Sequence, residues 1–311
     1  MIDFFAKKNS YMANKCYPWI ISLRPKTLAL SFSAILLGNA LAYWQHSFDL
    51  IIMLLAMITA ALLQILSNLA NDYGDAVKGG DKHNLIGHQR GLQLGLITLN
   101  QLKIAIWITI ILCVCSGLTL LWLACNNAYQ LLIFILLGLS SIIAAITYTV
   151  GKKPYGYIGL GDLSVLIFFG LVGVMGSYYL QTKTLSASIV FPAIASGLLA
   201  VGVLNINNLR DYESDKQHHK RTLIVLIGKT YGCCYQLVLL IVSLCFFGLF
   251  AYQQLHTYCS GIFLLTLPLY LKHMYMVFKF NTNKDAVPLL VQMVKLALLT
   301  NLLYCLGIIL S

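Results

Sequence analysis

The chain has 311 residues, of which 59% are apolar and only 10% are charged, and its mean hydropathy is +0.80. This composition excludes a soluble globular domain, because such domains carry about 25% charged residues. The net charge of +11 belongs to one face of the molecule, as the positions of the basic residues indicate, and does not predict a nucleic-acid partner.

Nine apolar segments are long enough to cross about 30 Å of hydrocarbon, which takes roughly 20 helical residues. In chain order they are predicted at Thr27 to Trp44, Leu50 to Leu69, Leu102 to Ala124, Leu131 to Val150, Leu163 to Leu180, Ser188 to Asn208, Cys234 to Tyr252, Cys259 to Phe278 and Ala286 to Leu310. Residues 1–26 lack the apolar core and cleavage site of a signal peptide. We therefore expect a cytoplasmic N-terminal segment, 1–26, followed by a single all-α integral membrane domain, 27–311.

The basic residues lie almost entirely on one side of these segments. Nineteen of the 21 Lys and Arg residues precede the first span or lie around the connections after the second, fourth, sixth and eighth spans. Lys183 lies on the opposite side, and Lys295 lies inside the ninth span. Because cytoplasmic loops carry the excess of Lys and Arg, the rich side is predicted to be cytoplasmic. A basic face of this kind suits anionic lipids or an anionic substrate.

The second span ends in the polar sequence NLANDYGDAVKGGD, from Asn68 to Asp81. Residues four apart share one face of a helix, so Asn68, Asn71 or Asp72, and Asp75 are expected to form a polar stripe. Asp81 follows in a glycine turn that is able to fold back toward the stripe. Acidic residues at the edge of a span indicate a functional site by default.

The sixth span ends in a related sequence, NNLRDYESD, in which Asn207, Asp211 and Asp215 are again four apart. The two motifs share the form N-[N or D]-x-x-D and lie four spans apart. This repetition predicts two four-helix pseudo-repeats, with a ninth helix appended, around a central cavity.

Six of the ten acidic residues lie in these two motifs. If the two helix ends face each other, the carboxylates repel unless a cation lies between them. Oxygen ligands without His or Cys favour Mg²⁺ or Ca²⁺ over zinc, and Mg²⁺ commonly takes further ligands from substrate phosphates. The predicted cofactor is therefore Mg²⁺ with a bound diphosphate, and the predicted metal ligands are Asn71, Asp72, Asp75, Asp81, Asn207, Asp211 and Asp215.

Side chains next to the motifs are candidates for contacts with the substrates. Charge-assisted bonds to diphosphate oxygens are predicted for Lys78, Arg90, Lys152 and Arg210. Tyr148 lies four residues before Lys152 at the end of the fourth span, and Asp162 opens the fifth span as a candidate acceptor contact. Within that span the glycines at 170, 173 and 176 are expected to form one small-residue ridge for close helix packing.

In the sequences NLANDYGDAVKGGD, KKPYGYIGLGD and LNINNLRD, the chain resembles the UbiA-type intramembrane prenyltransferases. It is most similar to the members that act on 1,4-dihydroxy-2-naphthoate in menaquinone synthesis. The similarity runs from Ser22 to Leu303, nearly the whole chain. It implies a multi-pass enzyme of the bacterial cytoplasmic (inner) membrane, whose partners are a polyprenyl diphosphate, an aromatic acceptor and the lipid bilayer, with no obligate protein partner.

The resemblance also implies roles for individual residues. Carried over by position, the metal and diphosphate ligands fall on Asn71, Asp75, Asp211 and Asp215. Tyr148 and Lys152 match a catalytic pair near the reactive carbon and the diphosphate, and Arg90 matches the Arg of the loop after the first motif.

Two alternatives stay open. A sibling prenyltransferase acting on 4-hydroxybenzoate would use the same metal chemistry and differ in its acceptor. A cation transporter also combines repeated halves with membrane acids, but its coupling acids are expected near mid-span. Here the acids lie at helix ends beside lysines and arginines, which disfavours the transporter.

Overall fold

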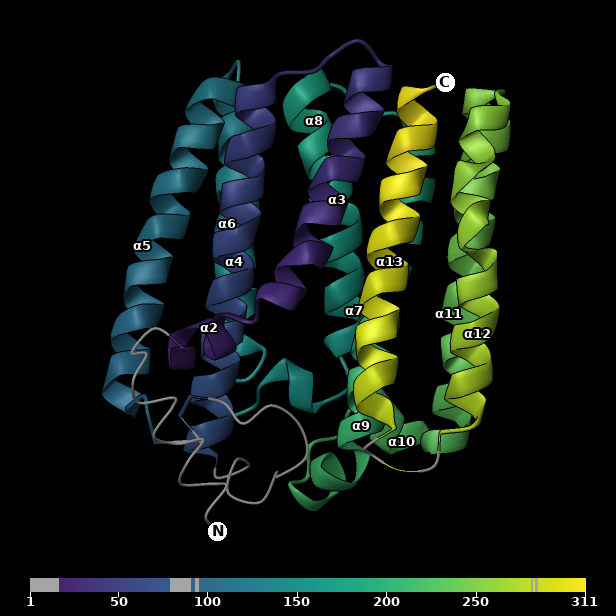
Figure 1. The fold of residues 1–311 in the computed structure, drawn as a ribbon. Coiled ribbons are helices and arrows are strands. Elements are labelled where there is room, and N and C mark those ends of the chain that lie inside the picture. The colour runs from purple at the N-terminus through teal and green to yellow at the C-terminus, as the bar shows by residue number, and fades with distance from the viewer. Residues whose placement is uncertain (1–16, 79–90, 93–94, 281, 283–284) are drawn as a thin grey trace.

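The structure is a computed structural model that describes residues 17–78, 91–92, 95–280, 282 and 285–311. Within these residues the chain forms a bundle of helices that run up and down (Figure 1), and nine helical segments are long and apolar enough to cross a membrane. The prediction of an all-α, nine-span membrane protein is therefore confirmed, while the duplication of a four-helix unit stays a prediction.

The elements are α2 (Tyr17–Leu23), α3 (Pro25–Trp44), α4 (Leu50–Val77), α5 (Leu99–Ala124), α6 (Ala128–Thr147), η2 (Tyr155–Tyr157), α7 (Gly161–Val165), η3 (Leu166–Gly176), α8 (Ser177–Thr182), η4 (Ala187–Ile189), α9 (Val190–Gln217), α10 (Leu223–Ile227), α11 (Lys229–Phe250), η5 (Ala251–Leu255), η6 (Tyr258–Thr266), α12 (Leu267–Phe278) and α13 (Ala286–Ile309).

The two motif-bearing helices, α4 and α9, are 28 residues each. At 1.5 Å per residue each is about 42 Å long, which exceeds the hydrocarbon thickness. The predicted apolar spans end at Leu69 and Asn208, and both helices continue through the motifs, as their spacing predicts, to Val77 and Gln217. The motif residues thus keep the helical spacing that places every fourth side chain on one face.

Side-chain caps fix where several spans begin. The Asp49 carboxylate accepts bonds from the backbone N–H groups of Ile51, at 2.7 Å, and Ile52, at 3.2 Å, at the start of α4. Thr98 and Gln101 form a reciprocal capping box at the start of α5. Such caps satisfy backbone donors that a helix end leaves without partners.

The fifth span contains η3, an 11-residue π-helix. Its backbone hydrogen bonds join residue i to residue i+5, so each turn contains more residues than a turn of an α-helix. Residues three apart therefore do not share one face of η3, although they nearly do in an α-helix. Gly170 packs closely on α9, where an added Cβ would lie 3.0 Å from the Cα of Gly197, as a packing ridge requires. At Gly176 an added Cβ would meet, among the described residues, only the Phe134 ring, at 3.9 Å, so the ridge prediction is wrong for this glycine.

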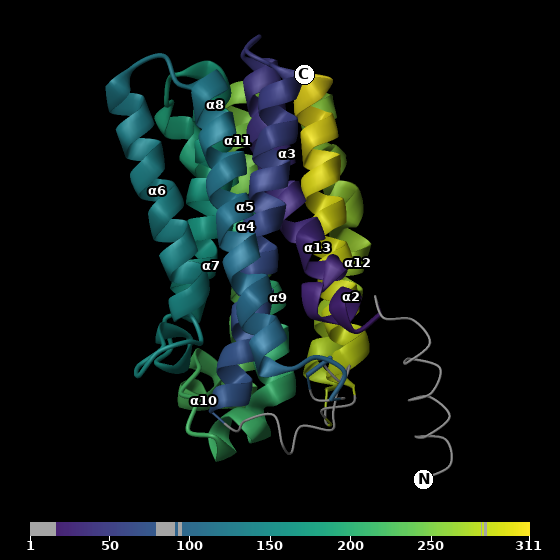
Figure 2. The ribbon, with the colours of Figure 1, turned by 90° about the vertical axis from the view of Figure 1, so that its left-hand side faces the viewer.

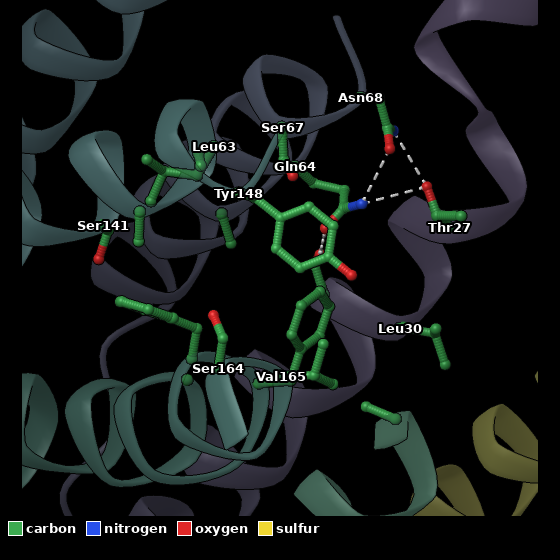
Figure 3. A pocket seen from close by; sticks show the side chains of 18 of the residues that line it. Thr27, Leu30, Leu63, Gln64, Ser67, Asn68, Ser141, Tyr148, Ser164 and Val165 are labelled. Carbon is green, nitrogen blue, oxygen red and sulfur yellow. Dashed lines mark hydrogen bonds between the residues drawn. The ribbon is translucent and has the colours of Figure 1, made fainter. Parts of the chain in front are cut away.

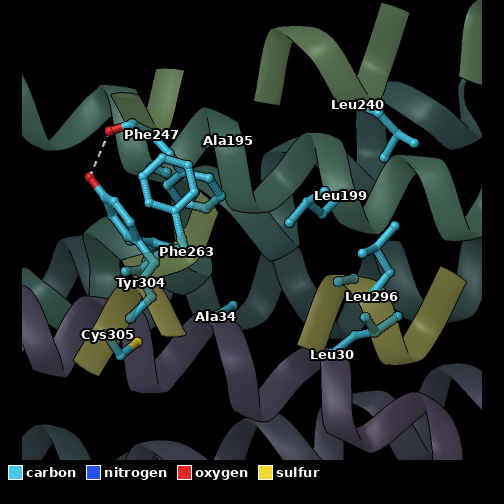
Figure 4. Packing of buried hydrophobic residues seen from close by; sticks show 14 of the residues in the cluster. Leu30, Ala34, Ala195, Leu199, Leu240, Phe247, Phe263, Leu296, Tyr304 and Cys305 are labelled. Carbon is cyan, nitrogen blue, oxygen red and sulfur yellow. Dashed lines mark hydrogen bonds between the residues drawn. The ribbon is translucent and has the colours of Figure 1, made fainter. Parts of the chain in front are cut away.

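The main hydrophobic core joins α3, α9, α11, η6 and α13 (Figure 4). The Tyr304 ring lies 4.3 Å from that of Phe247 and 5.2 Å from that of Phe263. The Tyr304 hydroxyl donates a hydrogen bond to the Phe247 carbonyl at 3.0 Å. These buried aromatics hold the α9 side of the bundle together.

The α6 side is packed differently. None of the residues of α6, all of which the structure describes, is buried. Figure 2 shows α6 at the edge of the bundle. Because α6 is apolar yet unburied, one of its faces is available to lipid and the other borders internal space.

A chain of buried polar side chains links α9 to α13. Asn205 donates to the Gln236 side-chain oxygen at 2.8 Å, the Gln236 amide lies 3.4 Å from His273 Nε2, and His273 Nδ1 lies 3.2 Å from the Gln292 side-chain oxygen. Asn205, Gln236 and His273 are fully buried. Buried polar groups in membrane bundles are stabilising only while they are paired.

We expect Gln236→Leu to lower the free energy of unfolding by about 1 kcal/mol, since it leaves Asn205 and His273 without this partner. Thermal unfolding of the detergent-solubilised protein, followed by size-exclusion chromatography, measures the loss. The exposed Gln253 provides the control, because Gln253→Leu removes no buried partner. Equal unfolding midpoints for the two variants would contradict the structural role of the network.

Candidate active site

One cavity of about 1160 Å³ runs between α3, α4, α5, α6, η3, α9 and α13. Apolar side chains line most of it, and apart from Lys295, which lies inside α13, its charged lining residues gather where α4 and α9 carry their motifs. Ala56 also lines the cavity and lies 19 residues before Asp75 on α4, so the cavity extends about 28 Å from its polar end. The shape and lining suit an amphiphilic ligand with a charged head and a long apolar tail.

The first motif presents Asn71 and Asp75 to the polar end of the cavity. The Asn71 side-chain oxygen accepts a hydrogen bond from the Thr149 hydroxyl at 3.0 Å, and Asp75 accepts one from the Tyr157 hydroxyl at 2.8 Å. Gly74 permits the close approach of Thr149 to α4, because a Cβ at Gly74 would lie 2.8 Å from the Thr149 carbonyl oxygen. The segment that follows α6 is thereby held against the motif.

The second motif presents Asn207, Asp211 and Asp215 to the same polar end. Arg210 forms a two-pronged ion pair with Asp211, at 2.8 Å from Nε and 2.7 Å from Nη2, and donates to the Asn207 oxygen at 2.9 Å. A bidentate pair of this kind fixes the carboxylate geometrically. The structure therefore brings both acidic motifs to one cavity, as their shared spacing predicts.

Lys220 lies between the two motifs, and the sequence reasoning missed it. Its Nζ is 3.5 Å from Asp215 and 5.3 Å from the centre of the Tyr157 ring. Burial lowers the pKa of Lys220, but the carboxylates of Asp215 and Asp75 raise it more, so the pKa lies above its usual value and the ammonium stays charged. The signal in the sequence is a lysine five residues beyond the last motif aspartate, where the chain turns back.

Asp72 does not line the cavity among the described residues. Its side chain is fully buried and pairs with Arg24 at 2.7 Å. Helical spacing alone would allow Asp72 to share a face with Asn68 and Asp75, four and three residues away, so the ion pair with Arg24 is what keeps its carboxylate from the cavity. The predicted role of Asp72 as a metal ligand is corrected accordingly: it anchors Arg24, which itself lines the cavity.

Tyr148 caps α6 and lines the cavity beside the motifs. Its ring stands edge-on to Tyr155 at 5.3 Å, and a Cβ at Gly161 would lie 3.0 Å from its hydroxyl oxygen. Burial raises the pKa of Tyr148 to about 12, which keeps the phenol protonated. The ring face is an electron-rich surface able to stabilise a cation.

A cluster of neutral polar side chains extends the polar lining toward the apolar part (Figure 3). The Gln64 amide donates to Thr27 and to Asn68 at 3.3 Å each, and the Asn68 amide donates to Thr27 at 3.1 Å. Gln64, Asn68, Asn71 and Asp75 follow one face of α4 at spacings of three or four. Sequence reasoning included Asn68 in this face but missed Gln64 and Thr27.

Three further predicted residues lie away from the cavity among the described residues. Lys152 is exposed, so the structure does not bring it to the motifs, and its catalytic and diphosphate-binding roles stay predictions. Lys78 stacks its ammonium over the Tyr157 ring at 4.1 Å. Asp162 does not line the cavity among the described residues, and its contact with an acceptor stays a prediction. Two other predicted residues, Asp81 and Arg90, fall outside the described residues.

The motif side chains fit a magnesium ion that is shared with a ligand. Within the described part of the chain, no three His, Cys, Asp or Glu side chains lie close enough to enclose a metal by themselves. The donors are carboxylate and amide oxygens, which suit Mg²⁺ completed by water and phosphate. Asp215 Oδ2 is buried and accepts no hydrogen bond from the described residues. A buried carboxylate oxygen of this kind is costly unless a cation or water reaches it.

The sequence has clear relatives. The sequence model of the UbiA prenyltransferase family matches residues 31–299. The chain is 54% identical to the 1,4-dihydroxy-2-naphthoate octaprenyltransferase of Escherichia coli (strain K12), over 94% of this chain and 95% of that protein. It is 45% identical to the 1,4-dihydroxy-2-naphthoate octaprenyltransferase of Haemophilus influenzae, over 94% of this chain and 96% of that protein.

Solved structures share the fold at low sequence identity. The apo structure of a UbiA homolog from Aeropyrum pernix K1 superposes with a TM-score of 0.69 at 18% identity, over 92% of this chain and 98% of that one. A UbiA homolog from Archaeoglobus fulgidus bound to GPP and Mg²⁺ gives a TM-score of 0.61 at 13% identity, over 92% and 99%. At these identities the likeness establishes the architecture alone.

Proposed function

Because this chain belongs to the UbiA prenyltransferase family, we propose that it transfers a polyprenyl group from a polyprenyl diphosphate to 1,4-dihydroxy-2-naphthoate. The products are diphosphate, CO₂ and demethylmenaquinol. The observation that carries the proposal is that both acidic motifs line the polar end of one long, mostly apolar cavity. The relatives at 54% and 45% identity, both named 1,4-dihydroxy-2-naphthoate octaprenyltransferase, support the acceptor.

The polar end binds the diphosphate. Asn71 and Asp75 of α4, with Asp211 and Asp215 of α9, would hold Mg²⁺, which when bound would supply Lewis-acid stabilisation of the leaving diphosphate. A relative of the same fold is bound to GPP and Mg²⁺, which supports this choice of metal. Lys220, which stays charged between the motifs, adds a cation where negative charge develops as the allylic carbon–oxygen bond breaks.

Tyr148 borders the space in which the allylic carbon becomes electron-poor. Because the Tyr148 phenol keeps its proton, the neutral ring stabilises positive charge through its π face and the hydroxyl does not act as a nucleophile. The surrounding apolar lining excludes water, which would otherwise capture the carbocation. Gln64 lines the cavity beside these residues, and its side-chain oxygen, which accepts one hydrogen bond from Ser31 at 3.4 Å, has a further lone pair for a hydroxyl group of the aromatic acceptor.

The chain is a multi-pass membrane protein, and we place it in the bacterial cytoplasmic membrane as one domain over residues 27–311 after an N-terminal segment. The positive-inside rule supports a cytoplasmic N-terminus and puts the polar end of the cavity on the cytoplasmic side. A water-soluble acceptor then enters from the cytoplasm, while the polyprenyl diphosphate enters from the bilayer.

A direct assay tests this function. Membranes containing the protein are incubated with Mg²⁺, radiolabelled octaprenyl diphosphate and either 1,4-dihydroxy-2-naphthoate or 4-hydroxybenzoate. We expect a prenylated product from the naphthoate alone, since both naphthoate relatives align over nearly the whole chain. Equal turnover of hydroxybenzoate would reject the acceptor assignment, and the lack of product from either acid would reject prenyl transfer to both.

A further inference from the structure

The cavity-facing side of α6 is continuous along the helix. Residues spaced three or four apart, as on a single helix face, line the cavity along α6, together with some of their neighbours. The lining residues are Phe134, Ile135, Leu137, Gly138, Leu139, Ser141, Ile142, Ala144, Ala145 and Tyr148. The same cavity is bordered by Gly117 of α5 and Gly176 of η3, so three helical elements each place a glycine on it.

These three glycines leave space open in the cavity. A Cβ added at Gly138 would have no described atom within 4 Å. Of the atoms that the structure describes, it would meet at Gly117 only a methyl group of Thr59, at 4.0 Å, and at Gly176 only the Phe134 ring, at 3.9 Å. Glycine is disfavoured inside helices, and close helix packing, which explains Gly170, does not explain these positions.

The glycines lie at increasing depth from the polar end. Gly138 is ten residues before Tyr148 on α6, about 15 Å along the helix axis. Gly117 contacts Thr59, which is 16 residues before Asp75 on α4, about 24 Å along that axis. The open space therefore continues well past the place where a short prenyl chain would end.

We propose that Gly138, with Gly117 and Gly176 beyond it, determines how long a polyprenyl tail the enzyme accepts, by keeping open the path between α4, α5, α6 and η3. The inference rests on the proposed function, because it assumes a diphosphate head at the two motifs. Phe134 stacks on Tyr179 at a ring distance of 5.6 Å and borders the deep part of this path. A long tail passes Gly138, whereas a tail of one or two isoprene units stays on the polar side of it.

The test compares two substitutions that add the same ring to an open glycine. Gly138→Phe fills the path, while Gly248→Phe adds the ring on α11, where a Cβ also has no described neighbour within 4 Å and where no cavity lining is present. For each purified protein we would measure the KM of octaprenyl diphosphate and the inhibition constant of geranyl diphosphate against it. We expect Gly138→Phe to raise the octaprenyl KM at least tenfold and to change geranyl inhibition less than twofold, with Gly248→Phe altering neither.

An unchanged octaprenyl KM in Gly138→Phe, or an equal weakening of both donors, would overturn the proposal. Gly138→Leu repeats the test with a smaller side chain if the Phe variant does not elute as a folded protein, and the same pattern is expected. If the wild-type enzyme transfers neither the octaprenyl nor a shorter chain, the proposed function fails and this inference falls with it. Selective weakening of the long donor supports tail-length control independently of which aromatic acid is the acceptor.

Discussion

Asp215→Asn is expected to lower kcat/KM for prenyl transfer on the order of a thousandfold, which corresponds to about 4 kcal/mol of transition-state stabilisation. Asp215 lines the cavity at the end of the second motif, and its Oδ2 is buried without a hydrogen-bond partner among the described residues. The amide keeps the shape of the side chain and removes the charge that a shared Mg²⁺ requires. The rate of product formation at saturating Mg²⁺ measures the loss of activity. If the residual activity requires a higher Mg²⁺ concentration, Asp215 is a ligand of the metal.

Glu213 provides the matched control for this charge removal. It lies two residues away on α9, but it pairs with Lys229 at 2.9 Å, its side chain is 55% exposed, and it does not line the cavity. Glu213→Gln is therefore expected to keep kcat/KM within about twofold, as surface pairs contribute little. If both variants lost activity equally, the net charge of the helix end rather than a metal ligand would explain the effect.

The membrane spans and the polar face of each motif could be predicted because both depend on local patterns, whereas the meeting of the two motifs is a hypothesis drawn from their repetition. Length and hydropathy alone indicate a membrane span, and the four-residue spacing places Asn71 with Asp75, and Asp211 with Asp215, whatever the rest of the chain does. The same spacing leaves Asn71 and Asp72 as alternatives beside Asp75, and the structure decides between them because the Asp72 carboxylate pairs with Arg24. The sequence motif contains no information about that partner.

The sequence could not show that Lys220 lines the cavity and Lys152 does not, because the positions of both lysines depend on turns that reverse the chain direction. His219 adopts a left-handed conformation with φ of 54°, and the Lys220 N–H bonds to the Asp215 carbonyl at 2.8 Å. This turn directs Lys220 into the cavity, whereas the segment after α6 leaves Lys152 exposed. The packing role predicted for Gly176 is wrong for a related reason, since the direction of this residue follows from a π-helix that the sequence pattern does not reveal.

Lys220→Met is expected to lower kcat on the order of a hundredfold and to raise the KM for the polyprenyl diphosphate. The ammonium lies 3.5 Å from Asp215 and stays charged beside both motifs, so it can bind the diphosphate where charge develops. Lys220→Arg should recover part of the activity because it restores the positive charge. Lys216→Met is the control, since Lys216 is exposed on the same helix end and does not line the cavity.

Removing Lys220 also leaves Asp215 as a poorly compensated buried carboxylate, which destabilises a protein by itself. The double variant Asp215→Asn with Lys220→Met separates this effect from catalysis, because it removes both charges of the pair. We expect the double variant to regain the thermal stability that Lys220→Met loses and to remain inactive. If activity returned together with stability, Lys220 would serve to hold the folded site rather than to bind the diphosphate, and the catalytic role assigned to it would be wrong.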